Sequence, residues 1–88
     1  MFEKVPINMY YSHEIAKHNK ETDCWIILHN NIYDVTDFLS KHPGGKRAIL
    51  SVAGQNATDE FEMIHPVGVI DAYLSKDSFV GQVINYKL

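Results

Sequence analysis

The sequence predicts an α+β domain in which a small mixed sheet supports several short helices. Two strands are expected over residues 24–28 and 32–35, because β-branched and aromatic residues dominate both runs. From about residue 46 to residue 74, apolar residues recur at helical spacing instead. The chain has 88 residues, 45% hydrophobic and 22% charged, which is ordinary for a globular protein. We therefore expect residues 1–88 to form one domain with a modest core.

The N-terminal segment is expected to contribute an edge strand and one short helix. Residues 1–8 have a mixed composition that accommodates a short edge strand. Ser12 is the expected N-cap of a helix that reaches about residue 17. His13 and His18 lie five positions apart, whereas a zinc-protease helix needs its two histidines at i and i+4. We therefore predict that both histidines are solvated.

A β-hairpin is expected next. Cys24–Leu28 reads as a buried strand, and Ile32–Val35 returns as its partner. Asn30 and Asn31 tolerate positive φ, so they are the predicted turn residues. Trp25 is expected to be a core residue.

The rest of the chain is expected to alternate short helices with a last strand. The first is a short helix capped by Thr36, with Phe38 and Leu39 pointing inward. A second helix is predicted over residues 46–53 and stops at Gly54, and a third, capped by Thr58 or Asn56, carries Phe61, Ile64 and His65. A fourth helix over residues 67–74 and a strand over residues 79–83 follow. The result is a small sheet with four short helices around two histidines.

The same short phrase occurs twice in this region. Phe38 precedes His42 by four residues and Phe61 precedes His65 by four residues, and a proline follows each histidine. Positions i and i+4 share a helix face, and the proline is expected to end each helix at its histidine. The two imidazoles are then placed to face each other across an apolar slot. We interpret the pair as a clamp for a flat iron cofactor, although lone histidines are more often ordinary core or surface residues.

Other chemistries fit these residues less well. A structural zinc site needs four ligands, and Cys24 is the only thiol. Neither a Gly-x-Ser-x-Gly elbow, a phosphate loop nor a Cys-x-x-Cys-His haem attachment is present. Non-covalent haem needs only one or two axial ligands and a flat apolar pocket, and Gly44-Gly45 lets the backbone approach a ligand closely. The side chains that suit the walls are Val35, Phe38, Ile49, Val52, Phe61 and Ile64.

A longer set of residues resembles a known family. They are His42-Pro43-Gly44-Gly45, the upstream Trp25-Ile26-Ile27-Leu28, Tyr33-Asp34-Val35-Thr36 and Phe38-Leu39, and the downstream Ala53-Gly54, Ala57-Thr58, Phe61-Glu62 and His65. Together they resemble the cytochrome b5 family over roughly residues 8 to 84. The resemblance implies the family's small α+β fold, in which two helix pairs form a haem cleft above the sheet.

The resemblance also implies a cofactor and its site. The cofactor would be non-covalent haem b, with His42 and His65 as the two axial ligands of the iron. The pocket residues that we expect are Val35, Phe38, Pro43, Gly44, Ile49, Val52, Phe61, Ile64 and Tyr73. Tyr73 matches a tyrosine near a haem propionate in flavin-dependent lactate dehydrogenase, but an ordinary half-buried helix tyrosine explains it equally well.

Two details distinguish this chain from microsomal members of the family. His42 and His65 are 23 positions apart, one fewer than in those carriers. This spacing is similar to that in the b5-type domains of sulfite oxidase, nitrate reductase and flavin-dependent lactate dehydrogenase. Lys46-Arg47 also replaces the acidic residues that follow the glycines, so the usual anionic docking rim is altered. Asp59, Glu60 and Glu62 keep acidic charge on the other helix.

An iron with two imidazole ligands has no open position for oxygen or substrate. We therefore expect an electron carrier rather than an enzyme, passing one electron between a reductase, such as a flavoprotein, and an acceptor enzyme. Each imidazole is expected to donate its other N–H to a backbone carbonyl. Two alternatives stay open: a haem or small-ligand sensor resembling the steroid-binding relatives, and a redox domain that acts in trans with a separate oxidoreductase.

Composition limits the partners and the compartment. The formal charge is −3 and the largest basic cluster is Lys46-Arg47, so nucleic acid is not an expected partner. The longest strongly apolar run, residues 25–28, falls far short of the ~20 residues that span a bilayer. A single cysteine suits a reducing compartment. We expect a soluble, cytoplasmic monomer without a membrane anchor.

Overall fold

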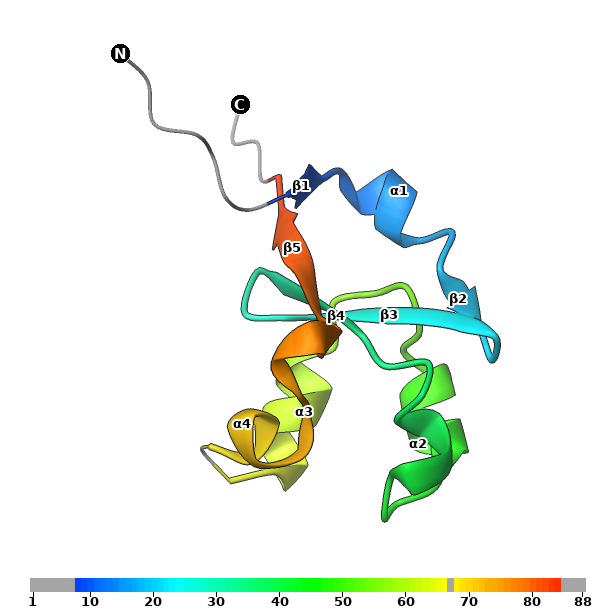
Figure 1. Ribbon diagram of the computed structural model, residues 1–88, viewed down its shortest axis with the longest axis vertical. Helices are drawn as coiled ribbons and strands as arrows, with labels where there is room; N and C mark the ends of the chain where they lie inside the picture. The colour runs from blue at the N-terminus through cyan, green and yellow to red at the C-terminus, as the bar shows by residue number, and fades with distance from the viewer. Residues whose placement is uncertain (1–7, 67, 85–88) are drawn as a thin grey trace.

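A five-stranded mixed sheet forms one end of the domain in a computed structural model that describes residues 8–66 and 68–84 (Figure 1). The strands are β1 (Met9–Tyr10), β2 (Asn19–Lys20), β3 (Asp23–Leu28), β4 (Asn31–Asp34) and β5 (Phe79–Val83). Their order is β1-β5-β4-β3-β2, with β1 parallel to β5 and the other pairs antiparallel. The predicted α+β class with a mixed sheet is confirmed.

Six short helical segments complete the fold. They are α1 (Ser12–Ile15), the 3-10 helix η1 (Leu39–Lys41), α2 (Lys46–Leu50), α3 (Thr58–Ile64), α4 (Val69–Tyr73) and the 3-10 helix η2 (Lys76–Ser78). In Figure 1, α2, α3 and α4 all lie below the sheet, α2 at the right and α3 with α4 at the left. Four of the segments, η1, α2, α3 and α4, lie around the two histidines, as predicted.

The β3–β4 hairpin forms where predicted, but its turn lies one residue earlier. Leu28 pairs with Asn31, so the two-residue loop consists of His29 and Asn30, with φ values of 54° and 73°. A two-residue hairpin loop of this type needs positive φ at both positions. The prediction of Asn31 as a turn residue was therefore wrong, because Asn31 begins β4.

Side chains of β3 alternate between the two faces of the sheet. Cys24, Ile26 and Leu28 belong to the cluster that faces α2 and α3, together with buried Val35 and Leu39. The opposite face carries a smaller cluster of Ile15, Ile27, Ile32 and Val83. This separation places the larger core directly beneath the two histidines.

Trp25 packs on the smaller cluster and is half-buried, so its prediction as a core residue was wrong. The ring of Tyr10 meets the indole edge-on, with centroids 5.2 Å apart. His18 stacks flat on the indole at 3.5 Å, and its Nδ1 lies 2.8 Å from Asp23 Oδ1. The prediction that His18 is solvated was therefore wrong as well, whereas His13 is exposed as predicted.

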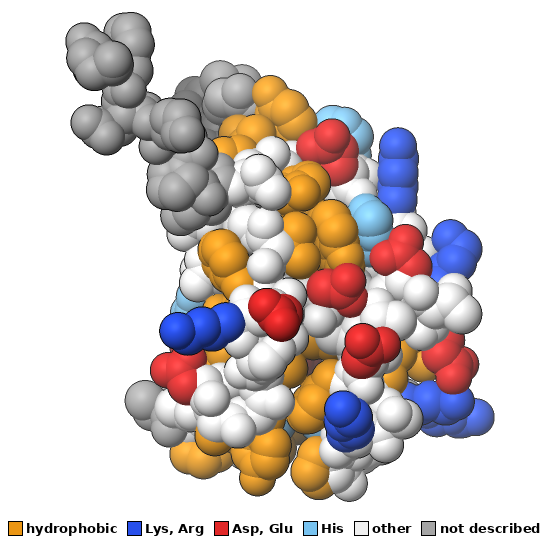
Figure 2. All heavy atoms as spheres, in the orientation of Figure 1, with side chains coloured by type: hydrophobic (Ala, Val, Ile, Leu, Met, Phe, Trp, Pro, Cys, Tyr) orange, Lys and Arg blue, Asp and Glu red, His pale blue; other side chains and the backbone are white. Residues whose placement is uncertain are grey.

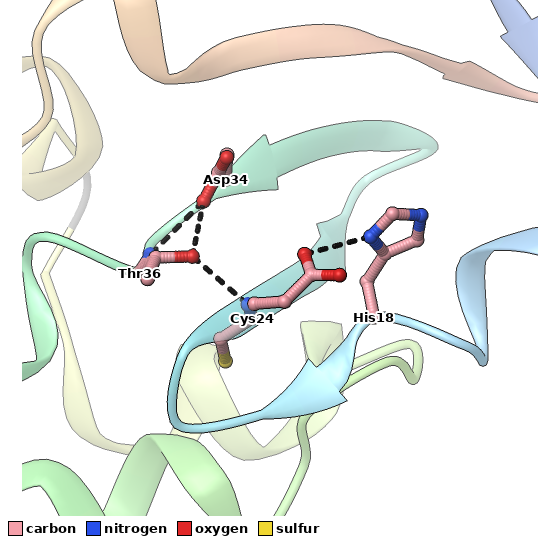
Figure 3. A network of polar contacts seen from close by, with 5 residues as sticks. His18, Cys24, Asp34 and Thr36 are labelled. Atoms are coloured by element: carbon pink, nitrogen blue, oxygen red, sulfur yellow. Dashed lines mark hydrogen bonds and ion pairs between the residues drawn. The ribbon is translucent and has the colours of Figure 1, made fainter.

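Thr36 links the two strands instead of capping a helix (Figure 3). Its hydroxyl accepts a hydrogen bond from the Cys24 N–H at 2.9 Å and donates one to Asp34 Oδ1 at 2.6 Å. The N-cap of η1 is Phe38. The predicted cap was wrong because a hydrogen bond between distant residues occupies the hydroxyl. Leu39 is buried and Phe38 packs on the core, so both point inward as predicted.

Other helix boundaries differ from the prediction by a few residues. Ser12 begins α1, and the N-cap is Tyr11, whose N–H donates to Glu14 Oε1 at 2.9 Å. α2 ends at Leu50, and turns continue to Gly54, which has a φ of +76°. Ahead of α3, the Asn56 side chain accepts the Thr58 N–H at 3.1 Å, although Ala57 is the formal N-cap.

Two further predictions fall partly outside the residues that the structure describes. The predicted edge strand over residues 1–8 lies almost wholly outside the described residues, and the edge strand that is described is β1. The helix predicted over 67–74 is α4, Val69–Tyr73, and residue 67 is outside the described residues. The last strand, β5, has the predicted bounds. Within residues 8–66 and 68–84, every helix is too short or too polar to cross a membrane.

Candidate functional site

His42 is held by the loop that follows it. The helix η1 ends at this residue, which is extended (φ −69°, ψ 123°) before Pro43, as predicted. The His42 Nδ1–H donates to the Gly45 carbonyl at 2.8 Å. Gly45 has φ +90° and ψ 159°, a conformation that only glycine adopts readily. Gly44 packs on the imidazole, since a Cβ there would lie 3.0 Å from His42 Cε1. Both glycines are thus needed for the ring's position.

His65 is held by the helix that precedes it. It follows α3 and is also extended (φ −110°, ψ 136°) before a proline. The backbone N–H of His65 donates to the Phe61 carbonyl at 2.9 Å, and its Nδ1–H donates to the same oxygen at 3.0 Å. The Phe61 ring stacks on the imidazole at 4.3 Å with an interplanar angle of 16°. One residue, Phe61, therefore sets the direction of the His65 imidazole by three contacts.

The two imidazoles face each other as the sequence predicted. Their ring centroids are 6.3 Å apart, and the planes are inclined by 44°. A carbonyl oxygen only accepts hydrogen bonds, so each Nδ1 carries the proton and each Nε2 has a lone pair available. An imidazole nitrogen binds a metal at about 2 Å, which requires centroids about 6 Å apart for two rings on opposite sides of one ion. The observed distance fits such an ion.

A cleft of about 700 Å³ opens between η1 with α2 and α3 with α4. Every residue that the sequence predicted for the site lines it: Val35, Phe38, His42, Pro43, Gly44, Ile49, Val52, Phe61, Ile64, His65 and Tyr73. Their contact with a cofactor stays a prediction. Figure 2 shows apolar side chains gathered at the lower end of the molecule, where these helices end in Figure 1.

Sequence reasoning missed nine further residues of the lining. They are Ile26, Leu28, Ala48, Ala57, Glu60, Pro66, Val69, Ile70 and Leu74. Strand alternation from Cys24 was a signal for Ile26 and Leu28, and helical spacing from Tyr73 was a signal for Val69 and Ile70. Glu60 had no such signal. It is the only carboxylate among the lining residues that the structure describes.

The floor of the cleft is buried, and part of its rim is strongly exposed. Val35 and Leu28 are each 1% exposed, whereas Ile64 is 76% and Tyr73 58% exposed. The Tyr73 ring lies 6.5 Å from Phe38, across the mouth. Its predicted role beside a haem propionate stays a prediction.

Two charged residues on the helices beside the cleft, Lys46 and Glu62, form specific pairs. Lys46 Nζ lies 2.5 Å from Glu21 Oε2, so this lysine is tied to the segment before β3. On α3, Glu62 Oε2 lies 2.7 Å from His29 Nε2. The predicted effect of Lys46-Arg47 on docking stays a prediction.

The only cysteine is unsuited to metal or redox chemistry. Cys24 is fully buried, and this burial, reinforced by Asp34 and Asp23, raises the pKa of its thiol from 9.0 to about 11. Over the described part of the chain, no three His, Cys, Asp or Glu side chains come together as a metal site. The paired imidazoles are therefore the site that the chemistry of the chain supports.

A family model described as "Cytochrome b5-like Heme/Steroid binding domain" matches residues 12–84. The chain belongs to this family. The solved structure of cytochrome b5 of Ostreococcus tauri virus 2 has a TM-score of 0.83 and 49% sequence identity, over 85% of this chain and 95% of that one. The fold and the resemblance predicted from the sequence are thereby confirmed.

Two larger relatives contain a similar segment. "L-lactate dehydrogenase (cytochrome)" of Wickerhamomyces anomalus is 39% identical over 70 residues, which is 80% of this chain and 12% of that protein. "Nitrate reductase [NADH] 2" of Arabidopsis thaliana is 50% identical over 64 residues, 73% of this chain and 7% of that protein. The predicted likeness to these two classes is confirmed, and the likeness to sulfite oxidase stays a prediction. The chain spans only a small fraction of either protein.

The family and the structural match indicate a non-covalent haem b, as predicted. The residues present fit this group, because the cleft is lined mainly by apolar side chains and by two imidazoles whose Nδ1 atoms, not their Nε2 atoms, are bonded to backbone carbonyls. A haem-based electron carrier is the function that the relatives support in general terms.

Proposed function

We propose that this domain carries single electrons on a haem whose iron is ligated by Nε2 of His42 and Nε2 of His65. The observation that carries the proposal is the facing pair of imidazoles, 6.3 Å apart, with both Nδ1–H groups bonded to backbone carbonyls. Bound haem would supply an iron that changes oxidation state by one electron. If His42 and His65 both held that iron, neither oxygen nor substrate would have a coordination site.

The protein's contribution is to fix the ligands and to exclude water. A backbone carbonyl that accepts the Nδ1–H holds the ring's tautomer and orientation and raises the basicity of the other nitrogen. The buried floor, with Val35 and Leu28, keeps the inner part of the cleft dry. Rigid ligands and a dry interior let the oxidation state change with little rearrangement of the protein.

We further propose that the exposed rim is the place where redox partners approach. Met63, Ile64 and Tyr73 lie at or next to the mouth and are the most exposed large apolar residues on that side. A reductase, such as a flavoprotein, would donate the electron and an acceptor enzyme would receive it. The cytoplasmic compartment, the monomeric state and the single-domain extent of residues 1–88 stay predictions.

A second candidate is a redox domain that serves an oxidoreductase. The observation that favours it is the similarity to segments of a lactate dehydrogenase and a nitrate reductase. The same iron chemistry applies, and only the partner differs. The sensor alternative is weaker, because two facing imidazoles leave no position on the iron for a signalling ligand.

The test is the visible spectrum of the purified holoprotein, oxidised and reduced. We expect a six-coordinate, low-spin spectrum that carbon monoxide does not change. Both His42→Ala and His65→Ala should abolish that spectrum and open the reduced iron to carbon monoxide. His13→Ala, at an exposed histidine of α1, is the matched control and should leave the spectrum intact. Absence of haem, or a six-coordinate spectrum retained in both cleft variants, would overturn the proposal.

A further inference from the structure

The helix that carries His65 packs on the core through Phe61, which is only half-buried. None of the described residues of α3, Thr58–Ile64, is fully buried, and Ile64 is 76% exposed. Side-chain burial is usually the main force that holds a helix on its domain. For α3, polar contacts to the sheet therefore carry a larger share of this role.

The tight turn between β3 and β4 makes two such contacts through one residue. The His29 backbone N–H donates to Thr58 Oγ1 at 2.9 Å, at the first residue of α3. The His29 Nε2 lies 2.7 Å from Glu62 Oε2, one turn further along the helix. Two backbone hydrogen bonds join Ile27 to Gln55 and Ala57, so they attach only the segment that leads into α3. Of the polar contacts described here, His29–Glu62 is the one that joins the second turn to the sheet.

This second turn is the part of α3 that orients the ligand. Phe61, next to Glu62, provides the carbonyl that accepts both His65 hydrogen bonds and the ring that stacks on the imidazole. A rotation of the turn would therefore move the acceptor and the stacking ring together. His65 also lines a second hollow of about 390 Å³ with His29 and Glu62, so packing does not fill the space between them.

We propose that His29 is a positioning residue for His65, acting by clamping both turns of α3 to the β-hairpin. This inference rests on the proposed role of His65 as an iron ligand. The clamp fixes the second turn of α3, and through Phe61 it fixes the plane of the His65 imidazole relative to that of His42. The positive φ of 54° at His29 brings its backbone N–H and its ring toward the same helix.

The clamp can be broken from either end while the turn is preserved. His29→Asn keeps a residue that tolerates positive φ but is too short to reach Glu62. His29→Gln carries an amide N–H at the position of Nε2 and should restore the contact. Glu62→Ala removes the acceptor. Asp59→Ala is the matched control, because it removes one carboxylate from the exposed face of the same helix and does not line the cleft.

Two measurements on the holoprotein test the inference. The first is the rate at which haem transfers to excess apomyoglobin, and the second is the set of electron paramagnetic resonance g-values of the oxidised iron, which report the angle between the ligand planes. Because the pair is half-exposed, we expect His29→Asn and Glu62→Ala to speed haem loss by only about two- to fivefold. Both should shift the largest g-value, and combining them should add nothing. His29→Gln should lie close to the unmodified protein.

The outcomes separate this inference from the proposed function. If the unmodified protein lacks a low-spin bis-imidazole signal, the proposed function fails. If that signal is present and neither clamp variant shifts it, or if Asp59→Ala shifts it equally, only the role of His29 is overturned. If His29→Asn does not fold, Glu62→Ala against Asp59→Ala decides the question from the helix end.

Discussion

The two histidines of the cleft face each other, yet the two sides hold them by different means. His42 is bonded to a carbonyl that follows it in a glycine loop, and His65 to a carbonyl of the helix that precedes it. The His42 side contributes Leu39 and Ile49 to the core, at 4% and 9% exposure. The described residues of α3 contribute no buried side chain.

This difference indicates that the two sides have unequal stability before a cofactor binds. The His42 side is part of the core that also contains β3, so we expect it to unfold only together with the domain. On the His65 side, only half-buried side chains such as Phe61 and Ile70 pack on that core, beside the entry segment and His29. Elements with fewer buried contacts open locally at lower free energy. Haem would then contact one preformed wall and stabilise the other.

The largest expected effect comes from truncating one isoleucine to alanine on each side of the cleft. Ile49→Ala should lower the free energy of unfolding of the apoprotein by about 2–4 kcal/mol, because it leaves a cavity in the core. Ile64→Ala, at an exposed position, should change it by about 0.5 kcal/mol or less. Urea unfolding of the two apoproteins measures both values. Equal losses would show that the two walls are equally built into the core.

The elements that were predictable are those whose signals are local. The β3–β4 strands, the helix ends at His42 and His65 and the glycine loop follow from alternation, proline geometry and glycine conformation. The i and i+4 spacing correctly made each Phe a neighbour of its His. Eleven of the twenty lining residues were predicted, some from these patterns and others, such as Tyr73, only through the family resemblance.

Apart from the one-residue shift of the turn at Asn31, the clearest errors concern residues whose partners lie outside the local pattern. The spacing of His13 and His18 predicts a solvated His18, but it contains no information on the stacking of His18 on Trp25. Thr36 resembles a helix cap, but the Cys24 N–H twelve residues earlier occupies it. The clamp at His29 depends on the one-residue position of the turn and on a helix 29 residues later. Local patterns do not contain such contacts.

The second test compares two glycines that both have positive φ in open space. Gly45 (φ +90°) belongs to the His42 side, and Gly68 (φ +91°) is the N-cap of α4 on the other side. A Cβ at either position would meet nothing within 4 Å. Each substitution by alanine should cost about 1–3 kcal/mol of backbone strain. Gly45→Ala should also speed haem loss and shift the g-values, because its carbonyl holds His42. Gly68→Ala should destabilise without that spectroscopic change. Similar spectra for both variants would show that the loop does not orient the ligand.

The last test concerns Cys24, in the core beneath both sides. Its thiol is buried, and the pKa is raised from 9.0 to about 11, so the folded state binds this proton more tightly than the unfolded state. The stabilisation is fully present below pH 9.0 and is lost as pH rises through about 11. At pH 8, native apoprotein should react with iodoacetamide at least about 100-fold more slowly than an exposed thiol, because thiolate is scarce and access is closed. Amide hydrogens of α3 should exchange under the same conditions well before Cys24 is alkylated. If the alkylation of Cys24 were as fast as the amide exchange of α3, the His65 side and the core would open together. The two walls would then not differ in stability.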